Sequence, residues 1–212
     1  MKHTIVVFLR FGQENHIKDL YENGTVYLNT IEYFRGLKDT GFRGDPYEGI
    51  DRVINTLPGS FIIPSINHTV NYQKIHIPGN KVYKGNLYCL YTISSKTIPD
   101  PESFRIDSKN LNFGTHCLVI KEPGTVLKKM KKALNKAKYK FHHDFVEYYD
   151  KEKYSGNLDP FKKSLEYEHQ NEFRFFVENL ANEPITIKIG SMKKYSQIYT
   201  VEDMMGLQLR VN

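Results

Sequence analysis

The stretch NEFRFFVE, from Asn171 to Glu178, decides the fold of this chain. Side chains alternate between the two faces of a β-strand, so Glu172 and Arg174 are expected together on one face. Three apolar side chains lie on the opposite face: Phe173, Phe175 and Val177. An isolated buried charge is too costly, so charged residues in an aromatic strand must be paired or lie in a cleft. The stretch therefore predicts a buried strand that carries either a structural ion pair, of Glu172 with Arg10 or Arg174, or a functional site.

Outward from this strand, the chain alternates apolar runs with turn residues. Strands are expected at residues 4–9, 25–28, 70–77, 87–94, 116–120, 184–189 and 207–211. A short helix over 16–22 should stop at Asn23 and Gly24, and a turn or helical segment should begin at Asn29 and Thr30. Residues 36–49 are expected to form a loop, and 145–149 fit either a strand or a helix. This order predicts an α+β fold: a single domain over 1–212 with a mixed, mostly antiparallel sheet and a few helices.

Composition limits the class of protein. The 212 residues are 40% hydrophobic and include 15 Tyr and 13 Phe, which is enough to build a core. The two cysteines, Cys89 and Cys117, form neither a disulfide framework nor a C-x-x-C zinc knuckle. The apolar stretches are too short to cross a bilayer and none near Met1 resembles a secretory signal. We therefore expect a cytoplasmic protein with no membrane partner.

The net charge of +6 has a local origin. Between Lys121 and Lys140 there are eight lysines and one glutamate, so this stretch carries +7 and the remainder 6 − 7 = −1. Apolar residues recur there at helical spacing: Leu127, Met130, Leu134, Ala137 and Phe141. We expect an amphipathic helix with Thr125 as its N-cap. Its lysines, including Lys128, Lys129, Lys131 and Lys132, form either a solvated outer face or a nucleic-acid footprint that gains affinity by counterion release.

Motifs with strict catalytic spacing are absent from the sequence. There is no phosphate-binding Gly-rich loop, no G-x-S-x-G and no H-E-x-x-H. His142, His143 and Asp144 are adjacent, so their side chains point in different directions, and we predict no metal site there. Three polar groups remain as candidates for chemistry: Arg10 at the end of the first strand, the segment 43–48, and the pair Glu172 and Arg174.

Two of these groups carry a family resemblance. Asp45, Pro46, Tyr47 and Glu48 match an N-D-P-F-E-like loop in which Gly44 replaces the asparagine. A second set keeps the spacing of a late K-x-x-x-W-x-Y-E-x-E-W-R motif: Lys163, Tyr167, His169, Gln170, Glu172, Phe173 and Arg174. The chain thus resembles a large bacterial family of uncharacterised proteins that have both motifs.

The layout is also similar, more distantly, to ADP-ribosyltransferase-like folds. Such folds place Arg or His at the end of the first strand, an aromatic residue near the second, and Glu on a late strand. The resemblance implies Glu172 and Arg10 as catalytic residues and NAD as co-substrate. It implies that NAD contacts four residues: Arg10, Tyr27, Asn29 and Tyr33. A carboxylate stabilises the oxocarbenium-like transition state, an aromatic ring stacks on nicotinamide, and Arg holds ribose or pyrophosphate.

Three functional hypotheses remain open from the sequence. The first is an ADP-ribosyltransferase-like enzyme, a bacterial or phage-conflict toxin countered by an antitoxin, whose nucleic-acid acceptor is held by the lysine helix. Its substrate contacts would include Asp45, Glu48 and Arg174. The second is a metal-dependent nuclease in which Asp45, Glu48 and Glu172 hold a divalent cation. The third is a non-catalytic module that binds nucleic acid or a protein through the lysine face.

Overall fold

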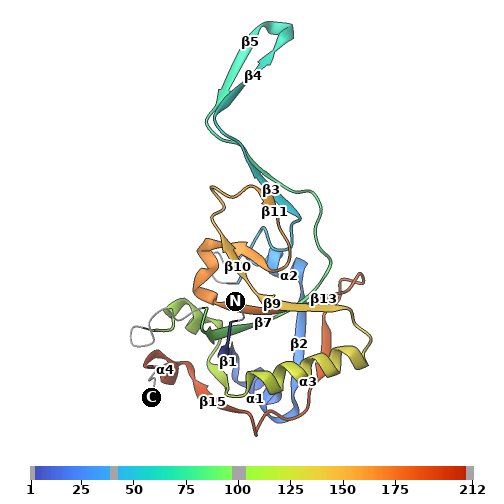
Figure 1. Cartoon of the computed structure of the whole chain (residues 1–212), viewed down its shortest axis with the longest axis vertical. Helices are drawn as coiled ribbons and strands as arrows, with labels where there is room; N and C mark the ends of the chain where they lie inside the picture. Colours follow the sequence, from blue (N-terminus) through green and yellow to red (C-terminus); the bar gives the residue numbers. More distant parts are fainter. Residues whose placement is uncertain (1–2, 39–42, 97–103, 209–212) are drawn as a thin grey trace.

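The chain forms an α+β fold around one large antiparallel sheet (Figure 1). The structure is a computed structural model that describes residues 3–38, 43–96 and 104–208. Six strands follow the order β14-β2-β7-β1-β8-β15, while β13 pairs with β7 and β9 pairs with β13. The bounds are β1 Ile5–Gly12, β2 Thr25–Thr30, β7 Gly85–Ser94, β8 His116–Ile120, β9 Phe141–Phe145, β13 Glu172–Glu178, β14 Ile185–Lys188 and β15 Ser196–Thr200. All pairings in this sheet are antiparallel, so its mostly antiparallel character is confirmed, but the sheet is not the mixed one that was expected.

The strand β7 lies at the centre of the sheet, and one of its edges pairs with two different strands. On one edge it pairs with β13 along its length, from Gly85 to Tyr91. The opposite edge is shared, because β2 pairs only at its start, with Asn29 opposite Leu87, and β1 begins to pair at Tyr91. Within the described residues, no strand pairs with residues 88–90 on this edge. The sheet therefore has a gap between β1 and β2.

Two helices cover one face of the sheet. Helix α1, Glu14–Asn23, connects β1 to β2, and α3, Pro123–Lys136, follows β8. Their buried residues, such as Leu20 and Met130, join the same core cluster as Phe173 and Phe175 of β13. The remaining helices are α2 Ile31–Gly36, α4 Val201–Met205 and the 3₁₀ helices η1 Pro64–Ile66, η2 Ser108–Phe113 and η3 Leu165–Gln170. In the described part of the chain, no helix combines the length and apolarity needed to cross a membrane.

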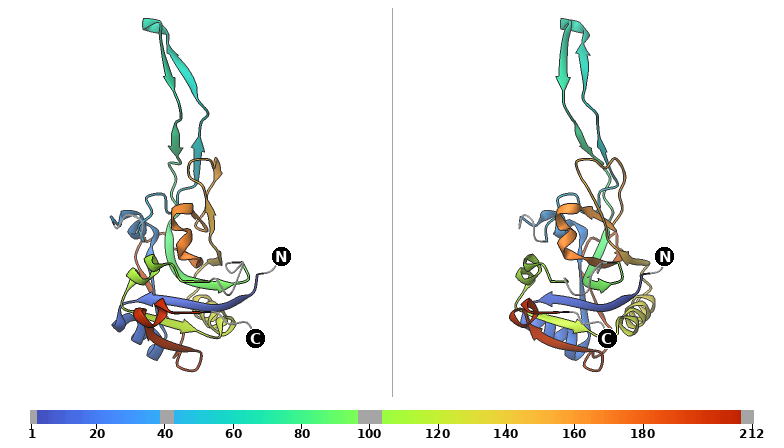
Figure 2. Two further views of the ribbon diagram at one scale, coloured as in Figure 1. Left: turned by 90° about the vertical axis from the view of Figure 1, so that its left-hand side faces the viewer. Right: turned by 60° about the vertical axis from the view of Figure 1, so that its left-hand side comes forward.

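A long ribbon projects from this body (Figures 1 and 2). We call residues 52–78 the arm. Near the body, β3 Arg52–Asn55 pairs with β6 His76–Pro78, and farther out β4 Gly59–Ile63 pairs with β5 His68–Tyr72. A bridge between Ile50 and Val82 closes the arm at its root. Three short strands lie between arm and sheet: β10 Glu147–Tyr149, β11 Gly156–Asn157 and β12 Lys162–Ser164.

Most of the expected strands are confirmed, two are corrected, and several described strands, β15 among them, were not expected. The strand expected at 70–77 is divided between β5 and β6 of the arm, because Pro58 on the facing segment has no N–H for a continuous ladder. No strand forms at Leu207 and Gln208, which follow α4, and residues 209–211 of that predicted strand lie outside the described residues. The last described strand is β15, which was not expected because its sequence, SQIYT, is largely polar.

The lysine helix is shorter than its apolar spacing predicted. Helix α3 begins with Pro123 at its first turn and Glu122 as N-cap, so Thr125 is not the cap. It ends at Lys136, and Lys138 has a positive φ of 60°. This left-handed residue turns the chain out of the helix, so Phe141 begins β9 instead of extending the apolar stripe. Residues 145–149, which fitted either element, belong to β9 and β10.

Gly24 gives a test of how α1 is joined to β2. It has φ of 65°, and an added Cβ would overlap the backbone of Gly190. We expect Gly24→Ala to lower the free energy of unfolding by more than about 2 kcal/mol, since the left-handed conformation alone costs about 1–2 kcal/mol. The matched control is Gly124→Ala in α3, where a Cβ meets no atom within 4 Å. Urea denaturation should find this control unchanged or more stable by up to about 1 kcal/mol; equal losses would contradict the prediction.

Candidate functional site

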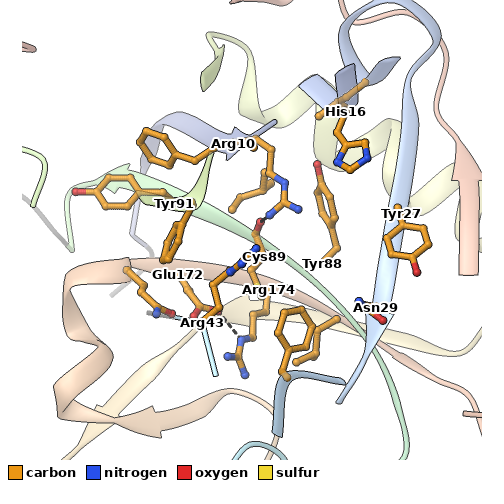
Figure 3. A pocket seen from close by; sticks show the side chains of 18 of the residues that line it. Arg10, His16, Tyr27, Asn29, Arg43, Tyr88, Cys89, Tyr91, Glu172 and Arg174 are labelled. Atoms are coloured by element: carbon orange, nitrogen blue, oxygen red, sulfur yellow. Dashed lines mark hydrogen bonds and ion pairs between the residues drawn. The ribbon is translucent and has the colours of Figure 1, made fainter. Parts of the chain in front are cut away.

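A pocket of about 790 Å³ opens at the gap between β1 and β2. Its walls come from β1, α1, β2, α2 and the unpaired middle of β7. In Figure 3, Arg10 and Tyr88 lie between Tyr27 and Asn29 on one side and Tyr91 on the other. Seven of the residues singled out from the sequence line this one pocket: Arg10, Tyr27, Asn29, Tyr33, Glu48, Glu172 and Arg174.

Arg10 occupies the gap itself. Strand β1 leaves β7 after Leu9, and the Arg10 guanidinium reaches across so that Nη1 donates to the carbonyl oxygen of Cys89 at 2.9 Å. The same guanidinium lies 4.8 Å from the centre of the Tyr88 ring, a cation–π distance. The arginine thus satisfies a backbone acceptor that no strand reaches. A guanidinium has five N–H donors, and this bond uses one of them.

Strand β2 and helix α2 supply the opposite wall. Tyr27 and Asn29 share one face of β2 by alternation, whereas Val26 and Leu28 on the other face are buried in the core. The Tyr27 side chain is half exposed, at 52%. Tyr33 follows on α2, whose N-cap Thr30 accepts a hydrogen bond from the Tyr33 N–H at 3.0 Å. The wall therefore presents an accessible aromatic surface and a neutral amide.

The floor of the pocket is formed by four buried charged residues, which we call the ion cluster: Glu48, Lys163, Glu172 and Arg174. The Arg174 guanidinium donates Nη1 and Nη2 to the two Glu48 oxygens at 2.6 and 2.8 Å, and Nε to Glu172 Oε2 at 2.7 Å. Lys163 Nζ donates to Glu172 Oε1 at 2.9 Å and to Gln170 Oε1 at 2.7 Å. Of the pairs expected from the sequence, Glu172 with Arg174 is the one that forms.

The ion cluster is electrically balanced. Burial pushes the pKa of the Glu172 carboxyl upward, but attraction to Arg174 and Lys163 outweighs it and holds that pKa well below its usual range. Glu172 is therefore a carboxylate at every physiological pH. Both of its oxygens already accept a charged donor, yet a carboxylate has about four lone-pair sites, so it can accept a further hydrogen bond from a ligand.

A turn delivers Glu48 to the ion cluster. The Tyr47 N–H donates to Asp45 Oδ1 at 2.9 Å, and the Glu48 N–H donates to the Asp45 carbonyl oxygen at 2.9 Å. Asp at the first position and Pro46 at the second are typical of such turns. Asp45 itself is buried and does not line the pocket. Burial and the negative charge of Glu48 raise the pKa of the Asp45 carboxyl to about 6.

The four lysines chosen on α3 do not line the pocket. Lys128 and Lys132 are exposed, whereas Lys129 and Lys131 are partly buried. Lys129 Nζ donates to the carbonyl oxygen of Ile189 at 3.1 Å and lies 5.3 Å from the Tyr195 ring centre. Part of the lysine face is therefore structural, and the exposed part is left as a surface of positive charge.

The three carboxylates of the nuclease hypothesis do not surround a common point. Arg174 binds both Glu48 and Glu172, so their negative charge is already matched by protein cations. In the ranges that the structure describes, no three His, Cys, Asp or Glu side chains are grouped so that they could hold a metal ion. The arrangement gives this hypothesis no geometric support.

The pocket also contains residues for which no individual role was predicted. Lys163 and Gln170 stood in the late motif, and their spacing from Glu172 was the available signal. His16 lines the pocket from α1, and no motif marks it. Arg43, the first residue of the candidate segment 43–48, lines it from the loop before Asp45. Cys89 also lines it, but burial raises the pKa of its thiol to about 12, so it is no nucleophile at neutral pH.

Comparisons with known protein families, curated proteins and solved structures give no match for this chain. The resemblances noted in the sequence therefore stay predictions.

Asp45 makes a pH-dependent contribution to stability. Its pKa rises from 3.8 in the unfolded chain to about 6, so folding favours the protonated form. This contribution is complete below the unfolded value and is lost as pH rises through about 6. At 1.36 kcal/mol per pKa unit the loss is about 3 kcal/mol. We expect the free energy of unfolding of the wild type to fall by about that amount, relative to Asp45→Asn, between about pH 4 and pH 7.5.

The comparison of the two proteins cancels the titration of other carboxyl groups. Urea unfolding at several pH values is the measurement, and Asp159→Asn, at a half-exposed residue outside the pocket floor, is the control. Parallel stability curves for the wild type and Asp45→Asn would show that Asp45 is not perturbed.

Proposed function

We propose that this protein is an ADP-ribosyltransferase-like enzyme that cleaves NAD at the bond between nicotinamide and ribose. The observation that supports this most is the convergence of Arg10, Tyr27, Asn29, Tyr33 and Glu172 on one pocket. They come from four separate elements, β1, β2, α2 and β13. The pocket volume of about 790 Å³ lies within the roughly 300–1,000 Å³ typical of sites for small molecules and cofactors.

The chemistry follows from the permanent charge of Glu172. When the glycosidic C–N bond breaks, its electron pair leaves with nicotinamide and positive charge develops on the ribose. A carboxylate with a strongly lowered pKa does not donate a proton. Glu172 therefore acts by accepting a hydrogen bond from a ribose hydroxyl and by stabilising the positive charge that develops on the ribose. Lys163 and Arg174 hold the carboxylate in place from both sides.

The walls of the pocket suit the two ends of NAD. Arg10 presents a guanidinium whose geometry matches phosphate oxygens, and it lies beside the Tyr88 ring. The exposed ring of Tyr27 offers a stacking surface for nicotinamide or adenine. We also propose an ADP-ribosyltransferase-like fold, supported by Arg10 near the end of β1, Tyr27 on β2 and Glu172 on the late strand β13.

We propose nucleic acid as the acceptor of the transferred group. The exposed lysines of α3 concentrate positive charge on one surface of the same molecule. Clustered cations bind phosphate by releasing counterions and need no base contact. The proposal does not require α3 to line the pocket, because an acceptor strand is long compared with the site that holds NAD.

NAD cleavage is tested by the release of free nicotinamide, measured by chromatography, with NAD binding measured by calorimetry. We expect the wild type to release nicotinamide and Glu172→Gln to lose about 10²-fold or more in rate, as when one transition-state contact is removed. Tyr27→Ala should weaken NAD binding without unfolding the protein, since this side chain is half exposed.

Two controls separate catalysis from folding. Tyr83→Ala removes another exposed tyrosine that lies outside this pocket, so NAD binding and turnover should equal the wild type. Because Glu172 belongs to the ion cluster, thermal unfolding of Glu172→Gln must be recorded and the assay run below its transition. Undiminished turnover in folded Glu172→Gln, or no NAD binding by the wild type, would sink the proposal.

Acceptor binding is tested by replacing exposed lysines. The double variant Lys128→Gln, Lys132→Gln should bind single-stranded RNA more weakly and reduce the salt slope by about one unit per lysine. The matched control replaces Lys18 and Lys153, two exposed lysines outside α3. Fluorescence anisotropy over a range of salt concentrations is the measurement. Equal weakening by both double variants would refute a localised binding surface.

A further inference from the structure

The outer half of the arm has one apolar face with no cover. In β4 and β5, Phe61 pairs with Val70, and Gly59 with Tyr72. Alternation places one apolar set on the same face, together with His68, which pairs with Ile63: Phe61, Ile63, Val70 and Tyr72. The opposite face is mainly polar, with Ser60, Ile62, Thr69 and Asn71. Phe61 and Tyr72 stack with ring centres 6.3 Å apart, but no other described segment of the chain pairs with this ribbon.

An isolated two-stranded ribbon is marginally stable in water, so this face requires a partner. The arm extends away from the body, and Figure 2 shows its outer half standing clear of the other elements in both views. The exposed fractions are large for apolar side chains near the tip: Leu57 84%, Phe61 50%, Ile62 63%, Ile63 37% and Ile66 67%. Apolar exposure of this kind on a projecting element marks a contact surface.

We propose that the partner is a second copy of this chain, which packs its arm face to face against the first. Residues 53–73 contain no Asp, Glu, Lys or Arg, so two identical arms meet without repulsion between like charges. The body carries the excess lysines on α3, which lies at the opposite end of the molecule from the arm in Figure 1. Contact at the arm tips therefore keeps the two positively charged bodies apart.

The exposed area suits a weak symmetric dimer. Ile62 faces the other way, so four exposed side chains are available to this contact, Phe61 and Ile63 with Leu57 and Ile66 at the two ends of the ribbon. They contribute roughly 100 Å² each, scaled from the 150–250 Å² of a fully buried aromatic residue. Two copies then bury about 800 Å², which is the size of a weak, transient contact. A two-fold axis would place Phe61 and Ile63 of one arm against the same face of its partner, which is the usual geometry of homodimers.

Sedimentation equilibrium from low to high micromolar protein is the test. We expect the wild type to convert from monomer to dimer with increasing concentration. Phe61→Asp should lower the association constant at least about tenfold, because it buries a charge in the contact. The matched control is Ser60→Asp, which adds the same charge one residue away on the opposite face and should leave association within about twofold.

A second measurement covers the case in which Phe61→Asp opens the ribbon. Nitroxide labels on Ser65→Cys at the tip should give a short distance between copies of otherwise wild-type protein, whereas labels on Lys136→Cys should lie far apart. A wild type that stays monomeric overturns the proposal and leaves the arm to a different partner. Equal effects of Phe61→Asp and Ser60→Asp, or distant tip labels in the dimer, also overturn it. None of these results depends on whether the pocket cleaves NAD.

Discussion

The bidentate contact between Arg174 and Glu48 is the interaction on which the site depends. It joins the central strand β13 to a loop 126 positions earlier in the chain, with both partners almost fully buried. Two charges taken out of water repay that cost only when every donor and acceptor is matched, and removing one partner alone typically costs about 3–5 kcal/mol. Lys163 of β12 forms a second buried ion pair with Glu172, so three separate segments are held together around this carboxylate. The pocket floor is therefore rigid and neutral overall.

The second constraint is the gap in the sheet. A continuous ladder along β7 would have left no space between β1 and β2, and the middle of β7 would have been covered by backbone. Because the strands separate, the Cys89 carbonyl needs another donor, and Arg10 supplies it. Because the Arg10 side chain takes the place of a neighbouring strand there, the pocket stays open and contains a cation. Fold and candidate chemistry thus have one structural cause.

The sequence predicted those elements whose buried face makes apolar residues recur at the spacing of a strand or helix. Alternation located β13 and brought Glu172 and Arg174 to one face, and apolar runs located β1, β7 and β8. It could not assign Glu48 to Arg174, because a contact between distant segments has no local signature. The arm escaped notice for a related reason. Phe61, Ile62 and Ile66 are apolar but exposed, so the rule that apolar residues face the core does not apply there. The spacing of apolar residues also could not predict the positive φ of Lys138, which turns the chain away after α3.

The closed root of the arm has an evolutionary consequence. Ile50 and Val82 are bridged, so the chain leaves the body and returns to it at adjacent positions. Farther out, β4 and β5 pair only with each other among the described strands, so changes in the length or sequence of that outer half need not disturb the body. Glu48 lies two residues before the bridge and therefore outside the arm. Substitutions in the outer half of the arm can therefore be selected independently of substitutions in the pocket.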